Sequence, residues 1–401
     1  MSTAVRSRIQ SIDVLRGIVM VIMALDHVRD FFYKADLTKA ADAALDPTNM
    51  QTTTPALFFT RWITHFCAPV FVFLAGTSMY LMTARKTKKE ISVFLIKRGI
   101  WLVFVEVIII TLGWTFNPLF NVLILQVIWA IGISMILMGL VVYLPYQFIF
   151  AIGLLIVLGH NLMDFPAISK SLKGGFLADL AYFSEFSIYT IFENHIVLIV
   201  YAFLPWTGLM MLGYCFGKLF EKNADAVWRR KMLLRMGAGI ILLFIVLRLI
   251  NVYGDPVPWF AQQRGPVYSF LSFLNANKYP PSLVFICMTI GPAMIALAFL
   301  EKVQNRITSF FNIFGRVPMF YYILHFYIIH TLVVIVFYLQ GFTSKDIISP
   351  NNPFLFRPDT FGFNLWGVYG VWLLVILILY PLCRKYNRYK STHNKWWLGY
   401  L

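Results

Sequence analysis

The chain has 401 residues, of which 59% are hydrophobic and only 13% are charged. Soluble domains carry about a quarter charged residues, so this composition excludes an ordinary soluble protein and predicts a polytopic membrane protein. The net charge of +16 does not indicate a nucleic-acid partner, because most of the positive residues fall in alternate loops, as membrane topology requires.

A membrane-spanning helix needs about 20 predominantly apolar residues, and the sequence holds about ten such stretches. We therefore predict an all-α integral membrane protein whose transmembrane helices form one bundle and one domain over residues 1–401. The predicted spans are residues 12–33, 57–83, 98–115, 121–143, 146–162, 195–219, 233–252, 281–300, 317–340 and 364–384.

Lysine and arginine residues gather at the N-terminus, in most of the connections that follow even-numbered spans, and in the C-terminal tail. Cytoplasmic loops carry an excess of these residues, so we expect both termini in the cytoplasm. This N-in/C-in topology places the end of the first span, with His27, at the outer face of the bilayer.

The first predicted span carries polar residues at both ends, which is costly in hydrocarbon and usually serves a function. Arg16 and His27 share one helical stripe and lie roughly 16 Å apart along the axis. At the outer end we expect His27 to act as a general base, with Asp26 and Asp30 as catalytic partners and Asp30 holding the ring. At the inner end, Arg16 is suited to bind a phosphate-bearing cofactor. The alternatives are a structural histidine at a helix end and a charged membrane anchor.

The second predicted span places His65 at a depth similar to that of His27, which makes His65 the second catalytic candidate. Pro69 frees a backbone carbonyl in this span. The small residues Ala75, Gly76 and Ser78 permit close helix contact or the passage of a slim ligand. The histidines near the outer face come from different segments and lack metal-ligand spacing, so no metal site is predicted.

The outer loop over residues 253–279 places aromatic rings beside amides and charges, a combination that suits a sugar. The candidate substrate-binding residues are Trp259, Gln263, Lys278 and Tyr279. An aromatic belt at the lipid headgroups would have the same composition, so this alternative stays open.

The ninth predicted span brings Tyr321 and His325 onto one helical face, since they are four residues apart. His325 should lie about 12 Å from the cytoplasmic end, inside the hydrocarbon. A structural hydrogen bond is the alternative to a functional role for this histidine.

Four separated motifs resemble heparan-α-glucosaminide N-acetyltransferase-like proteins, which are transmembrane acyltransferases. They are Ile12-Asp13-Val14-Leu15-Arg16-Gly17 with His27, the segment 66–78, Lys278-Tyr279-Pro280-Pro281-Ser282-Leu283, and Gly315-Arg316-Val317-Pro318 followed by His325. The resemblance covers most of the chain and all ten predicted spans.

The resemblance implies acetyl transfer across a membrane, from cytoplasmic acetyl-CoA to an amino sugar or sugar hydroxyl at the outer face. Acetyl-CoA would be bound near the inner side by Arg16, Arg98 and Arg316, with Tyr321 and His325 along its arm. His27 would remove the proton of the acceptor, and a route through an acetyl-histidine is chemically open too. We expect a bacterial inner-membrane protein that contacts the lipid bilayer.

The chain also departs from its family. In some members an asparagine stands at the position of His27 and the working histidine follows in the next loop, but residues 34–56 contain no histidine here. This moves the expected catalytic role to His27, with His65 as the second choice. The alternative function is a transporter or exporter of a small polar solute. The sequence leaves open the acceptor, N- or O-acylation, the acyl chain length, and a monomer or a homodimer.

Overall fold

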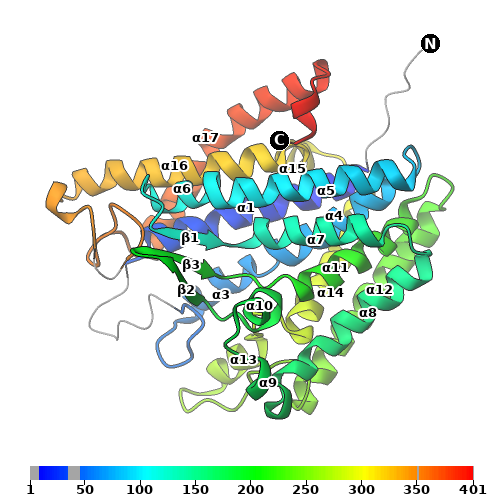
Figure 1. Ribbon diagram of the computed structural model, residues 1–401, viewed down its shortest axis with the longest axis horizontal. Coiled ribbons are helices and arrows are strands. Elements are labelled where there is room, and N and C mark those ends of the chain that lie inside the picture. The colour runs from blue at the N-terminus through cyan, green and yellow to red at the C-terminus, as the bar shows by residue number, and fades with distance from the viewer. Residues whose placement is uncertain (1–8, 35–45, 350–351, 401) are drawn as a thin grey trace.

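The computed structural model describes residues 9–34, 46–349 and 352–400, and most of them are helical. Figure 1 shows the course of the chain. The main helices are α1 (Gln10–Phe32), α3 (Pro55–Thr64), α4 (Cys67–Met82), α5 (Lys88–Phe104), α6 (Thr111–Thr115), α7 (Val127–Val141), α8 (Tyr146–Gly159), α11 (Leu204–Phe216), α12 (Ala226–Ile250), α13 (Pro266–Leu274), α14 (Leu283–Leu300), α15 (Arg306–Arg316), α16 (Pro318–Leu339) and α17 (Leu365–Thr392).

Short elements complete the described chain. Two π-helical segments are η1 (Val105–Ile110) and η3 (Asp179–Phe183), and two short α-helices are α9 (Pro166–Leu172) and α10 (Phe176–Ala178). The 3₁₀ segments are η2 (His160–Asp164), η4 (Gly217–Phe220), η5 (Ser344–Asp346) and η6 (Trp396–Gly399), and the strands are β1 (Val122–Leu125), β2 (Ser187–Phe192) and β3 (His195–Ile199).

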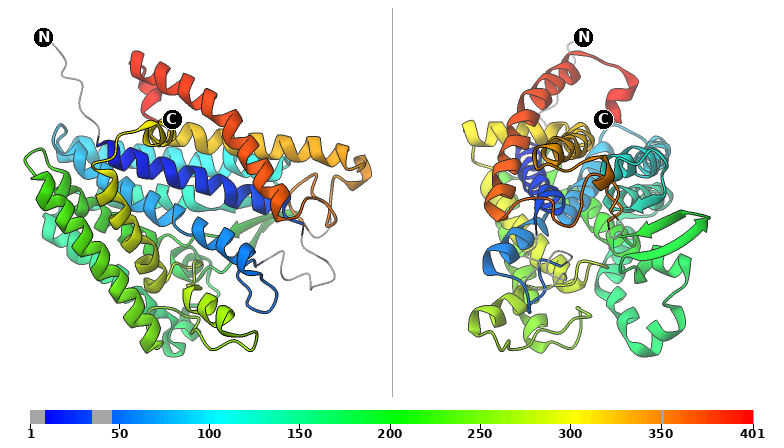
Figure 2. Two further views of the ribbon diagram at one scale, coloured as in Figure 1. Left: turned by 180° about the vertical axis from the view of Figure 1, so that it is seen from behind. Right: turned by 90° about the vertical axis from the view of Figure 1, so that its left-hand side faces the viewer.

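Helix α1 lies at the centre of the molecule. Of its 23 residues, 18 are buried, including charged residues at both of its ends. It packs against α3, α4, α14, α15, α16 and α17, and Figure 2 shows it in dark blue with these helices around it. Because α1 is enclosed by protein rather than by lipid, it can carry charges that a lipid-facing helix could not.

Glycine residues allow the main helix pairs to cross at close range. A Cβ atom added to Gly17 of α1 would lie 1.8 Å from the carbonyl oxygen of Phe311 in α15, and one added to Gly315 would lie 1.8 Å from that of Asp13. The α4–α11 crossing is built in the same way by Gly76 and Gly213, with 2.1 Å in each direction. Small residues at crossings are how membrane helices associate when the hydrophobic effect between them is weak.

Six described helices are long and apolar enough to cross a membrane, which makes this a membrane protein. They are Pro55–Met82, Tyr146–Asp164, Ala226–Ile250, Leu283–Leu300, Pro318–Leu339 and Leu365–Thr392. The connections α4–α5, α7–α8 and η4–α12 lie together at the right of Figure 1, and the sheet and the end of α16 lie at the opposite side. The view from behind in Figure 2 shows the same separation.

The expectation of an all-α fold is wrong for three short segments, which form a sheet of strand order β1-β3-β2. Strand β1 pairs parallel with β3, and β2 pairs antiparallel with β3. The predicted spans 121–143 and 195–219 therefore begin as strands and turn helical only at Val127 and Leu204. Strands β1 and β3 consist mainly of β-branched and leucine residues. The apolar character of such short runs does not by itself distinguish a strand from a buried helix.

Other predicted spans differ in their boundaries. The second is interrupted at His65 and Phe66, because Pro69 has no N–H for the carbonyl four residues earlier. The third begins ten residues early, at Lys88, where Thr87 and Glu90 form a capping box. The last continues to Thr392.

Candidate active site

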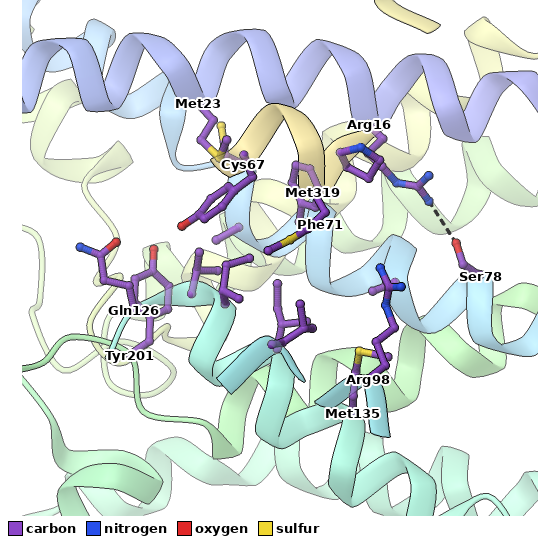
Figure 3. A pocket seen from close by; sticks show the side chains of 18 of the residues that line it. Arg16, Met23, Cys67, Phe71, Ser78, Arg98, Gln126, Met135, Tyr201 and Met319 are labelled. Atoms are coloured by element: carbon purple, nitrogen blue, oxygen red, sulfur yellow. Dashed lines mark hydrogen bonds between the residues drawn. The ribbon is translucent and has the colours of Figure 1, made fainter. Parts of the chain in front are cut away.

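A cavity of about 310 Å³ lies between α1, α4, α5, α7 and the start of α16. Figure 3 shows its lining, with Arg16 and Arg98 toward one end and Gln126 and Tyr201 toward the other. We call the first end, with Arg16, Ser78 and Arg98, the arginine end. The second, which we call the histidine end, contains Asp26, His27, Thr64, Gln126, Tyr201 and Lys278.

The arginine end presents two guanidinium groups from facing helices. Arg16 of α1 donates hydrogen bonds to Ser78 Oγ at 3.0 Å, to Asp13 at 3.0 Å and to the carbonyl oxygen of Gly315 at 3.2 Å. Arg98 of α5 donates to the carbonyl oxygen of Gly399 in the C-terminal segment. Two guanidinium groups at one end of the cavity are suited to bind phosphate groups.

Much of the cavity lining is apolar and flexible. Five methionines line the cavity, and they are Met23, Met79, Met82, Met135 and Met319. Methionine fills irregular gaps and adapts to different ligand shapes. The apolar part of the cavity therefore suits a slim, extended and largely uncharged ligand chain.

His27 is held by a second histidine at the histidine end. Its Nδ1 lies 2.7 Å from Nε2 of His325, and Nδ1 of His325 lies 3.2 Å from the carbonyl oxygen of Tyr321. A carbonyl oxygen only accepts, so neutral His325 donates through Nδ1 and accepts through Nε2. His27 then donates through Nδ1, and its Nε2 carries the free lone pair.

The geometry leaves Nε2 of His27 open to the cavity. Within the described part of the chain this nitrogen has no hydrogen-bond partner, yet it is not among the buried atoms that lack one, and His27 lines the cavity. The ring is fixed by aromatic neighbours, with Phe326 stacked at 4.5 Å and Trp114 edge-on at 5.3 Å. A fixed imidazole with one exposed basic nitrogen can accept a proton from a bound ligand.

Asp26 and Asp30 do not orient His27, contrary to the expectation that Asp30 would hold its ring. Asp26 accepts from Arg29 at 2.8 Å and also from Arg61 of α3, and Asp30 accepts from Arg29 at 2.6 Å. Both carboxylates pair with the two arginines rather than with His27, because an arginine–carboxylate pair is stronger than a hydrogen bond from a neutral imidazole. Asp26 still lines the cavity.

His65 lies outside the cavity, although its neighbour Thr64 lines it. Its ring packs against Phe285 at 5.3 Å, and its Nδ1 is buried without a hydrogen-bond partner in the described residues. The interruption between α3 and α4 points Thr64 and Cys67 toward the cavity instead.

Lys278 and Tyr279, two candidates from the outer loop, reach the histidine end. Lys278 is only 8% exposed and lines the cavity, and the Tyr279 hydroxyl accepts a hydrogen bond from Arg61 at 3.3 Å. Burial by itself raises the pKa of Tyr279, but the charges of Lys278 and Arg61 outweigh it, and the pKa lies below that of an ordinary tyrosine.

A half-buried carboxylate, that of Asp255, holds the loop on both sides of Lys278. Asp255 accepts from the N–H of Asn277 at 2.9 Å and from the hydroxyl of Ser282 at 2.8 Å. Burial raises the pKa of Asp255, while Arg248 and these hydrogen bonds act in the opposite direction. The loop that carries Lys278 is thus anchored rather than free.

Four other candidates lie outside the cavity lining. Trp259 donates its indole N–H to the carbonyl oxygen of Arg248, and Gln263 is exposed. Tyr321 is fully buried beside the ring of His325. Arg316, at the end of α15, is half-buried and has an enclosed Nε without a partner among the described residues.

Gln126 and Tyr201 are cavity residues that the sequence did not single out. Gln126 precedes α7, where the buried Glu106 accepts a hydrogen bond from the N–H of Trp129 at 2.9 Å. A carboxylate at a helix N-terminus is stabilising and fixes where the helix starts. A glutamine between apolar runs was the available signal for Gln126, whereas Tyr201 gave none.

In the ranges that the structure describes, no three or more His, Cys, Asp and Glu side chains lie close enough together to hold a metal ion. The four cysteines are buried, and none forms a disulfide with another.

A family model for the catalytic region of heparan-alpha-glucosaminide N-acetyltransferase matches residues 8–247. The match covers more than half of the chain. The chain belongs to this family. A comparison with curated proteins gives no match.

Membership of the heparan-alpha-glucosaminide N-acetyltransferase family implies an acyltransferase and gives no support to the alternative of a solute transporter. The matched region contains Arg16, His27 and Arg98. Lys278 and His325 lie beyond it, so their place in the site rests on the cavity and on the hydrogen bond to His27.

Proposed function

We propose that this protein transfers an acetyl group from cytoplasmic acetyl-CoA to an amino sugar or a sugar hydroxyl at the opposite face of a bacterial inner membrane. The observation that carries the proposal is the cavity, which links two arginines to the free Nε2 of His27. These ends are roughly 16 Å apart along α1 at 1.5 Å per residue. A slim pantetheine arm can lie in the apolar part between them.

The direction of transfer follows from the charge distribution. The connection between α4 and α5 carries Arg85 and Lys86, and α5 begins with Lys88 and Lys89, and positive segments of this kind face the cytoplasm. That connection lies close to the arginine end, because Arg16 contacts Ser78, which lies one turn before the end of α4. CoA phosphates then enter from the cytoplasm, and the acceptor meets the thioester at the other end.

The proposed chemistry is direct attack of the acceptor on the thioester. His27 takes the proton of the attacking amine or hydroxyl at Nε2 and then returns it to the departing CoA sulfur. The hydrogen bond from Nδ1 to His325 stabilises the imidazolium that forms in between. Base catalysis of this kind contributes about 10²- to 10⁴-fold to rate.

Sealed inside-out vesicles test this function. Acetyl-labelled CoA is added outside, where the cytoplasmic face is exposed, and glucosamine is loaded inside. We expect labelled N-acetylglucosamine to accumulate inside the vesicles, and no product when the same donor is added to right-side-out vesicles. Glucosamine flux that is independent of CoA, with no acetylated product, would favour transport and contradict the proposal.

Replacing Arg16 by alanine should weaken CoA binding by about 10- to 100-fold. A hydrogen bond to a charged group contributes roughly 1.5–3 kcal/mol, and the arginine end would keep only Arg98. The measurement is calorimetric titration of CoA into the protein in nanodiscs. Arg235→Ala is the control, because Arg235 is exposed on α12. The affinity of this variant for CoA should match that of the wild type. An unchanged dissociation constant in Arg16→Ala would assign Arg16 a structural role through its hydrogen bonds to neighbouring helices.

Replacing His325 by alanine should lower kcat by as much as about 10⁴-fold, the loss seen when a catalytic imidazole is held in the wrong tautomer. His325→Gln keeps a carbonyl oxygen that can accept from His27 Nδ1 and should retain more activity than the alanine variant. Steady-state kinetics with acetyl-CoA and glucosamine give this comparison, and CoA affinity reports whether the cavity is intact. Equal loss in both variants would assign His325 to packing alone.

A further inference from the structure

Lys278 is a buried cation that has no counterion among the residues that the structure describes. Its side chain is 8% exposed and lines the cavity at the histidine end. Among the residues that the structure describes, its ammonium group forms no ion pair, and it lies over the rings of Tyr279 at 5.1 Å and Tyr201 at 5.9 Å. An unpaired buried charge is costly unless the site supplies a partner during function.

The neighbouring charges cannot neutralise Lys278, because they neutralise one another. Asp26 pairs with Arg29 and Arg61, and Asp30 pairs with Arg29, which leaves two carboxylates matched by two guanidinium groups. Arg357 also acts on Asp30, so positive charge exceeds negative charge around this end of the cavity, and the charge of Lys278 acts on both Asp26 and His27. A negative charge that arises next to His27 would therefore be stabilised there.

We infer that Lys278 is a catalytic residue that stabilises the oxyanion formed on the thioester carbonyl during acyl transfer. The inference rests on the proposed function, because that function places the thioester beside His27. The oxyanion is the one negative charge that the reaction itself creates at this position. A positive group that is already in place and poorly solvated stabilises such a charge without reorganisation.

The lone pair of the acceptor forms a bond to the carbonyl carbon, and the π electrons of the carbonyl move to its oxygen, facing the Lys278 ammonium. His27 Nε2 takes the proton from the acceptor. The oxyanion then re-forms the carbonyl, the bond to sulfur breaks, and the CoA thiolate takes the proton from His27 and leaves as the thiol.

The loop that carries Lys278 is anchored, which supports the inference that its ammonium group is held in a fixed position. Asp255 holds the backbone before and after this residue through Asn277 and Ser282, and two aromatic rings flank the ammonium group. A lysine that only attracted substrates from solution would need neither burial nor an anchored loop. Tyr201 and Tyr279 also keep water from surrounding the charge, which strengthens its interaction with an oxyanion.

The test is steady-state kinetics of Lys278→Met in nanodiscs, with acetyl-CoA as donor and glucosamine as acceptor. Methionine keeps the length and the apolar stem but removes the charge. We expect kcat to fall by about 10²-fold or more, the loss seen when one oxyanion donor is removed, with KM for both substrates nearly unchanged. Lys278→Arg should recover part of kcat. Lys170→Met, at an exposed site on α9, should behave as the wild type.

Glucosamine is chosen because it has no anionic group, so a lost contact between Lys278 and an acceptor anion cannot lower kcat in this assay. Wild-type kcat in Lys278→Met would overturn the inference and leave the acetyltransferase function standing. A large rise in KM for glucosamine with unchanged kcat would also overturn it, by assigning Lys278 to acceptor binding. Loss of CoA affinity in Lys278→Met would indicate a collapsed cavity, and Lys278→Gln then provides the same comparison. Failure of the wild type to acetylate any acceptor would contradict the proposed function itself.

Discussion

His27→Ala is expected to lower acetyl transfer by about 10²- to 10⁴-fold, the range for a general base that acts in the rate-determining step. The reason is geometric: Nε2 of His27 is the basic nitrogen that the hydrogen bond to His325 leaves open to the cavity. CoA binding should change little, because Arg16 and Arg98 lie at the far end.

The assay for His27 measures turnover of acetyl-CoA with glucosamine, together with CoA affinity. His393→Ala is a matched control in the exposed C-terminal segment and should retain full activity. Near-normal turnover of His27→Ala would eliminate His27 as the base. Wild-type protein that becomes acetyl-labelled at His27 without an acceptor would replace direct transfer by the acetyl-histidine route.

Gly17→Ala is expected to destabilise the protein by about 3 kcal/mol or more, at the upper end of the range for overpacked sites. The added methyl group would lie 1.8 Å from the carbonyl oxygen of Phe311, and backbone cannot move aside as a side chain can. Helices α1 and α15 would have to separate. This separation would also disturb the hydrogen bond from Arg16 to Gly315.

Thermal unfolding in detergent, followed by circular dichroism, tests the crossing of α1 and α15. Gly370→Ala is the control, because a Cβ at Gly370 of α17 meets nothing within 4 Å, and alanine is the better helix former. We expect the control to match or exceed the wild-type melting temperature. Equal melting temperatures for Gly17→Ala and the wild type would show that the helices can part at no cost.

The sequence predicts the helices of this fold well where apolar stretches are long. Helices α12, α14 and α16 start and end within a few residues of the predicted spans, apart from the seven-residue early start of α12. The sheet was missed because β1 and β3 are apolar runs of four and five residues continuous with helix. Nothing in their composition marks where strand becomes helix.

The resemblance identified Gly17 and Gly315 as motif residues but gave no reason for them. The structure supplies one, since these two glycines meet at the crossing of α1 and α15. A contact between residues 298 positions apart cannot be derived from helical periodicity. Predicting this contact requires knowledge of how the helices pack in three dimensions.

In the candidate site, too, the sequence predicts residues that share one helix but not contacts between distant segments. Arg16 and His27 were found from one helix, because their spacing along α1 fixes the face they share, and Asp26 was found as the neighbour of His27 in sequence. His325 was singled out as a cofactor residue, whereas the structure places it against His27 and outside the cavity lining. The partner of His27 was predicted to be a carboxylate nearby in sequence, but arginines from α1 and α3 pair with both carboxylates.

The central claim is that one cavity connects a CoA site at Arg16 and Arg98 with the chemistry at His27. A density map of the protein with a non-hydrolysable ketone analogue of acetyl-CoA tests it most directly. The account predicts phosphates beside the two arginines, the pantetheine arm along the methionine-lined part, and the ketone between His27 Nε2 and the Lys278 ammonium. An analogue bound outside the cavity, or with its acyl group at the arginine end, would contradict it.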